Sequence, residues 1–359
     1  MDKLRLRRSV GIVVTNQHID FFKSNTRESI LLKMSNPQIL ELLQCFDGKT
    51  TIQQVCDKYK IRNSEQLEKL LAYLHQEHIL IQQDIQYPME LVVNKIRLLN
   101  LLEDYCHSTS EVITKIKELA DKTVMIIGLG AVGSFVAVQL AQFGVGKLIF
   151  VDKDLIDESN LHRQYYFEEQ LGTPKAEALQ KEILATHPDC KVEIIADFLT
   201  SGFFERHDIP NNLDLIINCA DEPNVDTTSR IVARYAMEKR IPHIVGGGYN
   251  LHLTLIGQTI IPFQTACFEC FNLFLKNLND ASLRNVKKLH RENRKLGSFA
   301  PLSGIASNLA ALDAFKLLIG KIDKLQQINK RIEFNSALHN FSVMRVNRSK
   351  ECKWCGNDQ

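Results

Sequence analysis

The chain has 359 residues, enough for two domains at roughly 150 residues each. Hydrophobic residues make up 45% of the chain and charged residues 24%, an ordinary globular composition that excludes general disorder. The 44 Lys and Arg residues nearly balance the 42 Asp and Glu residues, which leaves a net charge of +2. This balance gives no electrostatic reason to bind nucleic acid or an anionic membrane surface.

No apolar run approaches the ~20 residues that a membrane span needs. The basic start, MDKLRLRRSV, is followed by a stretch that polar residues interrupt, so it makes a poor signal peptide. We therefore expect a soluble, cytoplasmic protein. The nine cysteines are an odd number, which excludes a fully paired disulfide framework.

Residues 1–88 are expected to form a small α+β domain. Apolar runs at 9–14 and 29–33 predict strands, helical spacing predicts three helices that begin near residues 36, 51 and 64, and residues 79–82 predict a final strand. This order is typical of a winged helix. Since none of the predicted helices carries a dense basic face, we expect the domain to bind peptide and not DNA. Residues 89–120 are expected to be a helical connector.

From residue 121 to 359 the pattern predicts an α/β domain with a doubly wound, Rossmann-like, mainly parallel sheet, because apolar strands alternate with amphipathic helices. The predicted strands are 124–127, 148–151, 192–195, 213–218 and 243–245, and the predicted helices lie near 131–143, 173–187 and 223–239. The later segments are a strand over 252–261 as an antiparallel extension, a basic mobile loop over 274–297, a helix over 302–319, and strands at 331–334 and 341–346.

The glycine-rich segment Gly128-Leu-Gly130-Ala-Val-Gly133 follows one apolar strand and opens a helix. Gly128 suits the tight turn, Gly130 lets the backbone approach a phosphate, and Gly133 allows close packing of helix on strand. The helix N-terminus offers free N–H groups to the anion. Asp152 ends the next strand, in place to accept a ribose hydroxyl. The segment predicts a nucleotide site but does not distinguish NAD from ATP.

Arg163 and Lys175 favour ATP, because an enzyme that breaks the α–β phosphate bond must stabilise the charge that develops on pyrophosphate. Taken singly, each residue would more often be a surface charge, Arg163 on a loop and Lys175 at a helix start. Asp221 follows the fourth predicted strand, where the ligand crevice of a parallel sheet opens, and we assign it to Mg²⁺. The preceding Cys219 is expected to be a small buried filler and not a nucleophile.

Two Cys-x-x-Cys pairs, Cys267 with Cys270 and Cys352 with Cys355, have the spacing of a tetrahedral structural zinc site. Such an ion would attach the C-terminal segment to the middle of the chain. Redox-active pairs are the alternative. With four thiolates the zinc would have no open position for water, so it would not be catalytic.

Taken in order, GLGAVG, VDKD, NLHRQ, GTPKAE, CADEP, CFEC and CKWC resemble the motif series of the E1-like, ThiF-type adenylating enzymes, over about residues 121–355. The resemblance implies ATP as substrate and a homodimer in which an arginine from the partner subunit reaches the site; here Arg97 is the candidate. Carried over motif by motif, it implies that Asp152 and Asp154 hold the ribose and the active-site cations, that Asn160, Arg163, Gln164 and Lys175 contact the phosphates, and that Asp221 binds Mg²⁺.

Within that family, CADEP and FAPLSGIAS are similar to the microcin C7-type enzymes that modify ribosomally made peptides. The chain also resembles the pantocin-type maturation enzymes. The N-terminal domain resembles their leader-recognition domains. No cysteine lies between Cys270 and Cys352, so a covalent sulfur intermediate on that loop is not expected.

The sequence thus predicts an enzyme that adenylates a carboxylate of a precursor peptide for capture by a nitrogen, in the pantocin-like case between glutamates. Three alternatives remain open. The protein could activate a ubiquitin-like sulfur carrier, act as a non-catalytic peptide-binding scaffold, or, least in keeping with Arg163, Lys175 and Asp221, be an NAD dehydrogenase.

Overall fold

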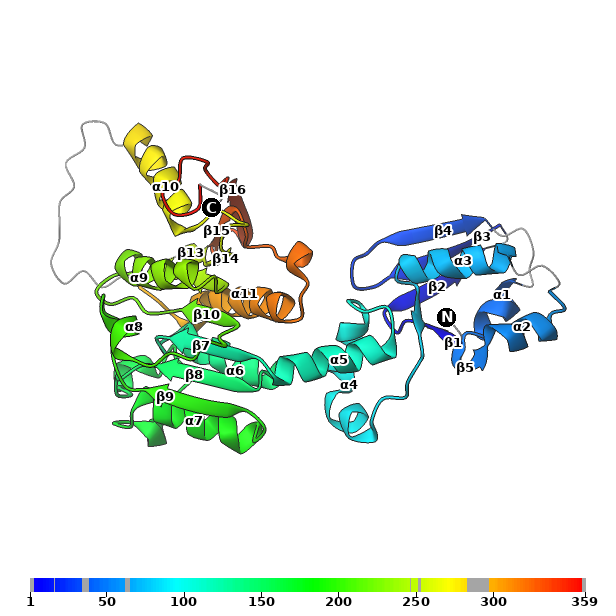
Figure 1. The fold of residues 1–359 in the computed structure, drawn as a ribbon, viewed down its shortest axis with the longest axis horizontal. Helices are drawn as coiled ribbons and strands as arrows, with labels where there is room; N and C mark the ends of the chain where they lie inside the picture. Colours follow the sequence, from blue (N-terminus) through cyan, green and yellow to red (C-terminus); the bar gives the residue numbers. More distant parts are fainter. Residues whose placement is uncertain are drawn as a thin grey trace. The chain divides into compact units, whose positions relative to one another are not determined.

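The computed structural model describes residues 3–15, 17–33, 39–61, 65–245, 247–250, 253–282 and 297–356. The chain divides into two compact units, Met1–Lys117 and Glu118–Gln359, drawn in blue to cyan and in green to red in Figure 1. Among the described residues, no helix is long and apolar enough to cross a membrane.

The first unit contains helices packed on short antiparallel strands. One three-stranded sheet has the order β5-β1-β6, and a second is the meander β2-β3-β4. The elements are β1 (Lys3–Leu6), β2 (Val10–Val14), β3 (His18–Lys23), β4 (Ser29–Lys33), α1 (Ile39–Gln44), β5 (Asp47–Thr51), α2 (Ile52–Lys58), α3 (Glu65–Gln76), β6 (Leu80–Gln82), α4 (Met89–Glu103) and α5 (Thr109–Ala120). The order α1-β5-α2-α3-β6 is winged-helix-like; the sequence predicts its three helices and its last strand, but not β5.

Local signals in the sequence explain where several of these elements begin. Helix α2 starts with a reciprocal capping box, in which the Thr51 hydroxyl accepts from the Gln54 N–H and the Gln54 side chain accepts from the Thr51 N–H. Arg7 is buried, and its guanidinium donates to the backbone oxygens of Leu80, Glu103 and Cys106. It therefore fixes the end of α4 to the strand region of the same unit.

The second unit is built on a six-stranded sheet of order β14-β11-β10-β7-β8-β9, parallel except for β14. Strand β7 is buried along its whole length, as expected for a parallel sheet covered on both faces. Its elements to this point are β7 (Thr123–Ile127), α6 (Gly133–Phe143), β8 (Lys147–Val151), α7 (Lys175–Thr186), β9 (Lys191–Ile195), α8 (Phe203–Arg206), β10 (Leu215–Asn218), α9 (Val225–Glu238), β11 (His243–Val245) and β14 (Gln258–Ile260).

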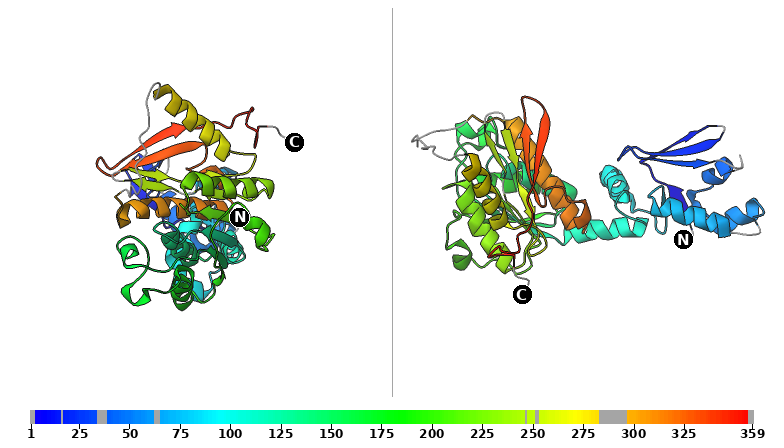
Figure 2. Two further views of the ribbon diagram at one scale, coloured as in Figure 1. Left: turned by 90° about the vertical axis from the view of Figure 1, so that its left-hand side faces the viewer. Right: turned by 90° about the horizontal axis from the view of Figure 1, so that it is seen from above.

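A four-stranded antiparallel sheet, β12-β13-β15-β16, completes the second unit. Helix α11 (Ala300–Leu318) packs against β12 and β13, and Figure 2 shows it along one side of this sheet. The remaining elements are β12 (Gly248–Asn250), β13 (Leu253–Ile256), α10 (Phe268–Ser282), β15 (Lys330–Asn335) and β16 (Asn340–Arg345).

Two sequence predictions need correction. The single strand expected over 252–261 is two strands on either side of Gly257, and they join different sheets: β13 pairs with β15, whereas β14 pairs with β11. The prediction of a loop over 274–297 is wrong for its first residues, because helix α10 continues to Ser282. The rest of that basic segment, 283–296, lies outside the described residues.

Candidate functional site

The glycine turn between β7 and α6 is required by close backbone contacts. Gly128 has φ +85°, and a Cβ there would lie 2.7 Å from the Ala220 nitrogen. A Cβ on Gly133 would lie 1.9 Å from the Gly128 oxygen. At Gly130, in contrast, a Cβ would meet only the Gln164 amide nitrogen, at 4.0 Å. The first and last glycines are thus needed by the fold, while Gly130 leaves space beside the turn.

Asp152 lies at the carboxyl end of β8 and braces this turn. Its Oδ2 accepts from the Leu129 N–H at 2.7 Å, and its Oδ1 accepts from the Asp154 N–H at 2.8 Å. Burial raises the pKa of Asp152, and these two N–H donors and the charge of Lys175 oppose the rise. Each carboxylate oxygen keeps a second lone pair, so a ligand hydroxyl can still be accepted.

Lys175 begins α7 and forms an ion pair with Asp154, Nζ to Oδ2, at 2.8 Å. The Lys175 side chain is 8% exposed and that of Asp154 is 46% exposed. An ammonium held this far from water interacts strongly with nearby anions, and two of its three N–H donors remain for a ligand. The structure therefore brings together Asp152, Asp154 and Lys175 beside the glycine turn.

The segment from Asn160 to Gln164 contributes its side chains unequally. The Asn160 side chain accepts from the Asp157 N–H at 3.1 Å, and Arg163 donates to the Ser159 carbonyl at 2.6 Å, so both make local contacts. Gln164 is buried, and among the described residues its Oε1 has no hydrogen-bond partner. A buried amide with an unused acceptor beside an open Gly130 marks a place for a ligand group.

Asp221 is exposed and follows β10, one residue after the Ala220 backbone that lies against Gly128. The buried Asn218 side chain accepts from the Ala220 N–H at 3.2 Å, and Thr228 donates to the Ala220 carbonyl at 2.6 Å. These two bonds fix the loop that carries Asp221. Burial, and less so the charge of Asp221, raises the pKa of Cys219 to about 12. The residue is half-buried, and its role as a filler remains a prediction.

Sequence reasoning missed two side chains that hold the site together. The Tyr166 hydroxyl donates to the Leu129 carbonyl at 2.8 Å, and the Ser134 hydroxyl donates to the Gly130 carbonyl at 2.8 Å. In QYYF, Tyr166 is indistinguishable from an apolar core residue, so only the folded contact shows its role. Arg97 lies exposed on α4 in the first unit, and its predicted reach to a partner's site remains a prediction.

The four cysteines of the predicted metal site meet in the second unit. All are buried, and their sulfur atoms lie within 4.8 Å of one another. The Cys267–Cys352 and Cys270–Cys355 sulfur pairs are each 3.5 Å apart. Four sulfurs at the corners of a zinc tetrahedron are about 3.8 Å apart, given a Zn–S bond of ~2.3 Å. The cluster therefore fits a structural zinc ion.

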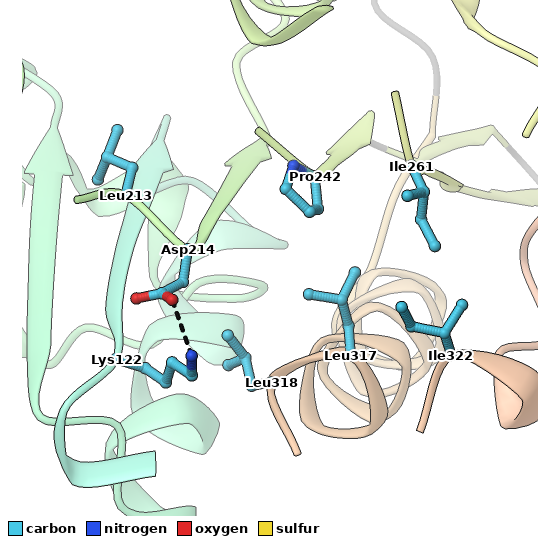
Figure 3. Close-up of a pocket in the computed structure, with 8 residues that line it drawn as sticks. All are labelled: Lys122, Leu213, Asp214, Pro242, Ile261, Leu317, Leu318 and Ile322. Atoms are coloured by element: carbon cyan, nitrogen blue, oxygen red, sulfur yellow. Dashed lines mark hydrogen bonds and ion pairs between the residues drawn. The ribbon is translucent and has the colours of Figure 1, made fainter. Parts of the chain in front are cut away.

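A cavity of about 310 Å³ lies elsewhere in the second unit (Figure 3). It is lined by Lys122, Leu213, Asp214, Pro242, Ile261, Leu317, Leu318 and Ile322. Lys122, Asp214 and Pro242 precede β7, β10 and β11, so the cavity lies at the amino ends of the parallel strands. Ligands of open α/β sheets bind at the opposite, carboxyl edge, where the glycine turn lies. An ion pair between Lys122 and Asp214, 2.9 Å long, occupies its polar side.

Comparison with known sequences gives a match to the ThiF family over residues 107–355. The chain is 27% identical over 242 residues to the sulfur carrier protein ThiS adenylyltransferase of Escherichia coli (strain K12), a match covering 67% of this chain and 88% of that protein. It is 25% identical over 256 residues to ubiquitin-like modifier-activating enzyme 5 of Oryza sativa subsp. japonica, covering 67% of this chain and 57% of that enzyme.

Comparison of structures extends the similarity to the whole chain. The crystal structure of E. coli MccB superposes with a TM-score of 0.80 at 23% identity, covering 100% of this chain and 98% of that one. Another structure of E. coli MccB contains ATP. A further structure shows the microcin C7 biosynthetic enzyme MccB in complex with N-formylated MccA. At this identity the similarity establishes the fold.

Proposed function

Because the chain belongs to the ThiF family, we propose that it is an ATP-dependent adenylating enzyme that activates a carboxylate of a ribosomally made precursor peptide. One observation carries the proposal. At a single edge of the parallel sheet, the glycine turn, the braced Asp152 and the Lys175–Asp154 ion pair adjoin the loop of Asp221. A dehydrogenase does not need a buried cation such as Lys175 beside the phosphates. An enzyme that releases pyrophosphate does, because negative charge develops on the leaving group.

We propose the nucleotide roles that the family resemblance implies, which the contacts of Asp152, Asp154 and Lys175 support. The N–H groups at the start of α6 receive phosphate oxygens, as at other helix N-termini. Asp152 and Asp154 hold the ribose and the cationic groups, and Asn160, Gln164, Arg163 and Lys175 contact the phosphates. Lys175 and Arg163 each supply about 3 kcal/mol of stabilisation in the transition state.

Asp221 fits a magnesium ligand. It is an exposed carboxylate on a braced loop beside the glycine turn, and oxygen ligands of this kind suit Mg²⁺ when the remaining ligands are phosphates and water. When bound, the ion neutralises phosphate charge. By holding the ion, Asp221 would place its positive charge beside the phosphates that leave as pyrophosphate.

The proposed reaction has two steps that balance. A carboxylate oxygen of the peptide attacks the α-phosphorus, the bond to the β-phosphate oxygen breaks, and pyrophosphate leaves. A nitrogen then attacks the acyl carbon of the adenylate and loses its proton, and AMP leaves with the oxygen that came from the carboxylate. We propose that this nitrogen belongs to the peptide and that, as in pantocin-like chemistry, glutamate side chains can be activated.

The peptide substrate is supported by the extent of the structural similarity. The curated adenylating relatives match about two thirds of this chain, whereas the MccB fold matches all of it, the first unit included. We propose that residues 1–88 recognise the leader of the peptide, and that the enzyme works in the cytoplasm. Activation of a sulfur carrier is the second candidate, which the similarity to the ThiS adenylyltransferase favours.

We further propose a homodimer in which Arg97 of one chain completes the site of the other. The family resemblance supports this arrangement, and Arg97 is free to act in it because it is exposed on α4. The zinc proposed for Cys267, Cys270, Cys352 and Cys355 is structural, because the four thiolates leave no position for a reacting group.

ATP–pyrophosphate exchange with candidate acidic precursor peptides tests the proposal. Exchange that depends on peptide and is lost in Asp221→Ala, but kept in Asp226→Ala on the exposed start of α9, would support it. Exchange with a carrier protein ending in Gly-Gly, and with no peptide, would favour the second candidate. ADP and phosphate in place of exchange would contradict adenylation.

A further inference from the structure

The orientation of two peptide groups decides whether the glycine turn can bind phosphate. A peptide group is planar and trans, so its N–H points away from its C=O. The Leu129 carbonyl shares a peptide group with the Gly130 N–H, and the Gly130 carbonyl shares one with the Ala131 N–H. Within the described part of the chain these two N–H groups have no acceptor, whereas both carbonyls do.

Tyr166 determines the first of these orientations. Its hydroxyl, on a side chain only 4% exposed, donates to the Leu129 carbonyl at 2.8 Å. Burial raises the pKa of Tyr166 well above its usual value, and the charges of Asp152 and Asp154 add to the rise, so the hydroxyl stays a donor. No other donor to the Leu129 carbonyl occurs among the described residues. Tyr166 therefore directs the Gly130 N–H away from itself.

Ser134 helps to fix the orientation of the Gly130 carbonyl and connects the glycine turn to the backbone of Tyr165. Its hydroxyl donates to the Gly130 carbonyl at 2.8 Å and accepts from the Tyr165 N–H at 3.1 Å. The Ser134 N–H also donates to the Gly130 carbonyl, at 3.1 Å, so this carbonyl has a second donor. The hydroxyls of Tyr166 and Ser134 thus join the glycine turn to the segment that carries Arg163 and Gln164.

We propose that Tyr166 is a positioning residue, whose hydroxyl turns the Gly130 N–H toward the phosphates of ATP and sets the spacing between the glycine turn and Gln164. The inference rests on the proposed ATP site. It assigns Tyr166 an effect on the phosphate end of the nucleotide alone, because the Gly130 and Ala131 N–H groups are the backbone donors left for an anion within the described part of the chain, and Asp152 is the group placed for the ribose.

The test compares binding of ATP with binding of adenosine in the full-length chain. Competition against a fluorescent ATP analogue, with Mg²⁺ present, gives both dissociation constants. In Tyr166→Phe we expect ATP to bind about tenfold more weakly, the value of one hydrogen bond to a charged group, and adenosine to bind within about twofold of the wild type. Ser134→Ala weakens ATP by a smaller factor, because the Ser134 N–H still holds the Gly130 carbonyl.

Tyr235→Phe is the matched control for loss of a tyrosine hydroxyl, since Tyr235 stacks on Phe204 away from the site. We expect this variant to bind ATP and adenosine as the wild type does. Equal loss of ATP and adenosine in Tyr166→Phe, or wild-type ATP binding, would overturn the positioning role. If Tyr166→Phe does not fold, the same comparison in Ser134→Ala decides. Failure of the wild type to bind ATP would instead overturn the proposed function, which is a separate result.

Discussion

At the carboxyl end of β8, Asp152 shows why the predicted site residues are not interchangeable. Sequence spacing predicts it as a ribose ligand, and the structure adds that both of its oxygens already hold backbone N–H groups of the site, from Leu129 and Asp154. Residue type and spacing could predict Asp152, Lys175 and Asp221. The bond of Tyr166 to Leu129 could not be predicted, because a tyrosine hydroxyl in an apolar run has no local signature.

The buried residue His243 in β11 is expected to make the stability of the fold depend on pH. It is fully buried, and burial lowers its pKa from 6.5 to about 4 despite the bond of Nδ1 to the Ile241 carbonyl. The unfolded chain binds a proton near pH 6.5 and the folded chain does not until near pH 4. Stability is therefore lost as pH falls below 6.5, by about 2 kcal/mol between pH 7 and pH 5.

Urea unfolding at pH 7 and pH 5 checks this prediction. In His243→Asn, whose amide can still donate to Ile241 and does not titrate, the pH-dependent loss should be smaller by that ~2 kcal/mol. An unchanged pH dependence in the variant would mean that His243 is not the titrating group.

At the scale of elements, the junction of β7 and α6 is specified by sterics that two of its three glycines satisfy. Gly133→Ala places a Cβ against the Gly128 carbonyl, 1.9 Å away, and should destabilise the fold by about 2 kcal/mol or more. Gly130→Ala meets only a side-chain amide at 4.0 Å and should change stability by no more than ~0.5 kcal/mol, while still weakening ATP binding.

Thermal unfolding and ATP titration of both variants separate the two effects. Equal stability of Gly133→Ala and the wild type would contradict the close helix–strand approach. Destabilisation by Gly130→Ala would contradict the open space beside it.

Local sequence signals predict the bounds of an element within a few residues, whereas an element that is defined by pairing with a distant strand has no such signal. The parallel strands β7, β8, β9 and β11 have apolar runs that set their positions. Strand β5 (Asp47–Thr51) is polar and contains an Asp-Gly turn signal, yet it is a strand because β1 pairs with it. The division of 252–261 at Gly257 likewise depends on which sheet each half joins.

At the scale of the whole molecule, the family match confirms the E1-like, ThiF-type resemblance predicted from the motif series. The cysteine cluster adds a long-range link, because Cys352 and Cys355 lie against Cys267 and Cys270 at the start of α10. A zinc ion there would join segments that are far apart in the sequence.

We predict about one zinc ion per chain, lost in Cys352→Ser together with a marked fall in unfolding temperature. Cys190→Ser, a buried cysteine outside the cluster, keeps its zinc. Elemental analysis and thermal unfolding measure both. A metal-free wild type with disulfides between these cysteines would support the redox alternative instead.

The dimer proposal can be tested by complementation. If Arg97 acts across the interface, mixing inactive Arg97→Ala and Asp221→Ala chains yields heterodimers with one intact site, and about a quarter of wild-type exchange activity should return. If Arg97 acts within its own chain, no activity returns on mixing; if it has no role, Arg97→Ala is already active before mixing, and either result contradicts the proposal.

The central claim is that a carboxylate attacks the α-phosphorus of ATP, and an oxygen tracer tests it most directly. A precursor peptide labelled with ¹⁸O in its carboxylates is incubated with the enzyme, Mg²⁺ and ATP, and the products are analysed by mass spectrometry. The account predicts that ¹⁸O appears in AMP and that pyrophosphate is unlabelled. Label in inorganic phosphate, formed together with ADP, would show attack at the γ-phosphorus and contradict the account.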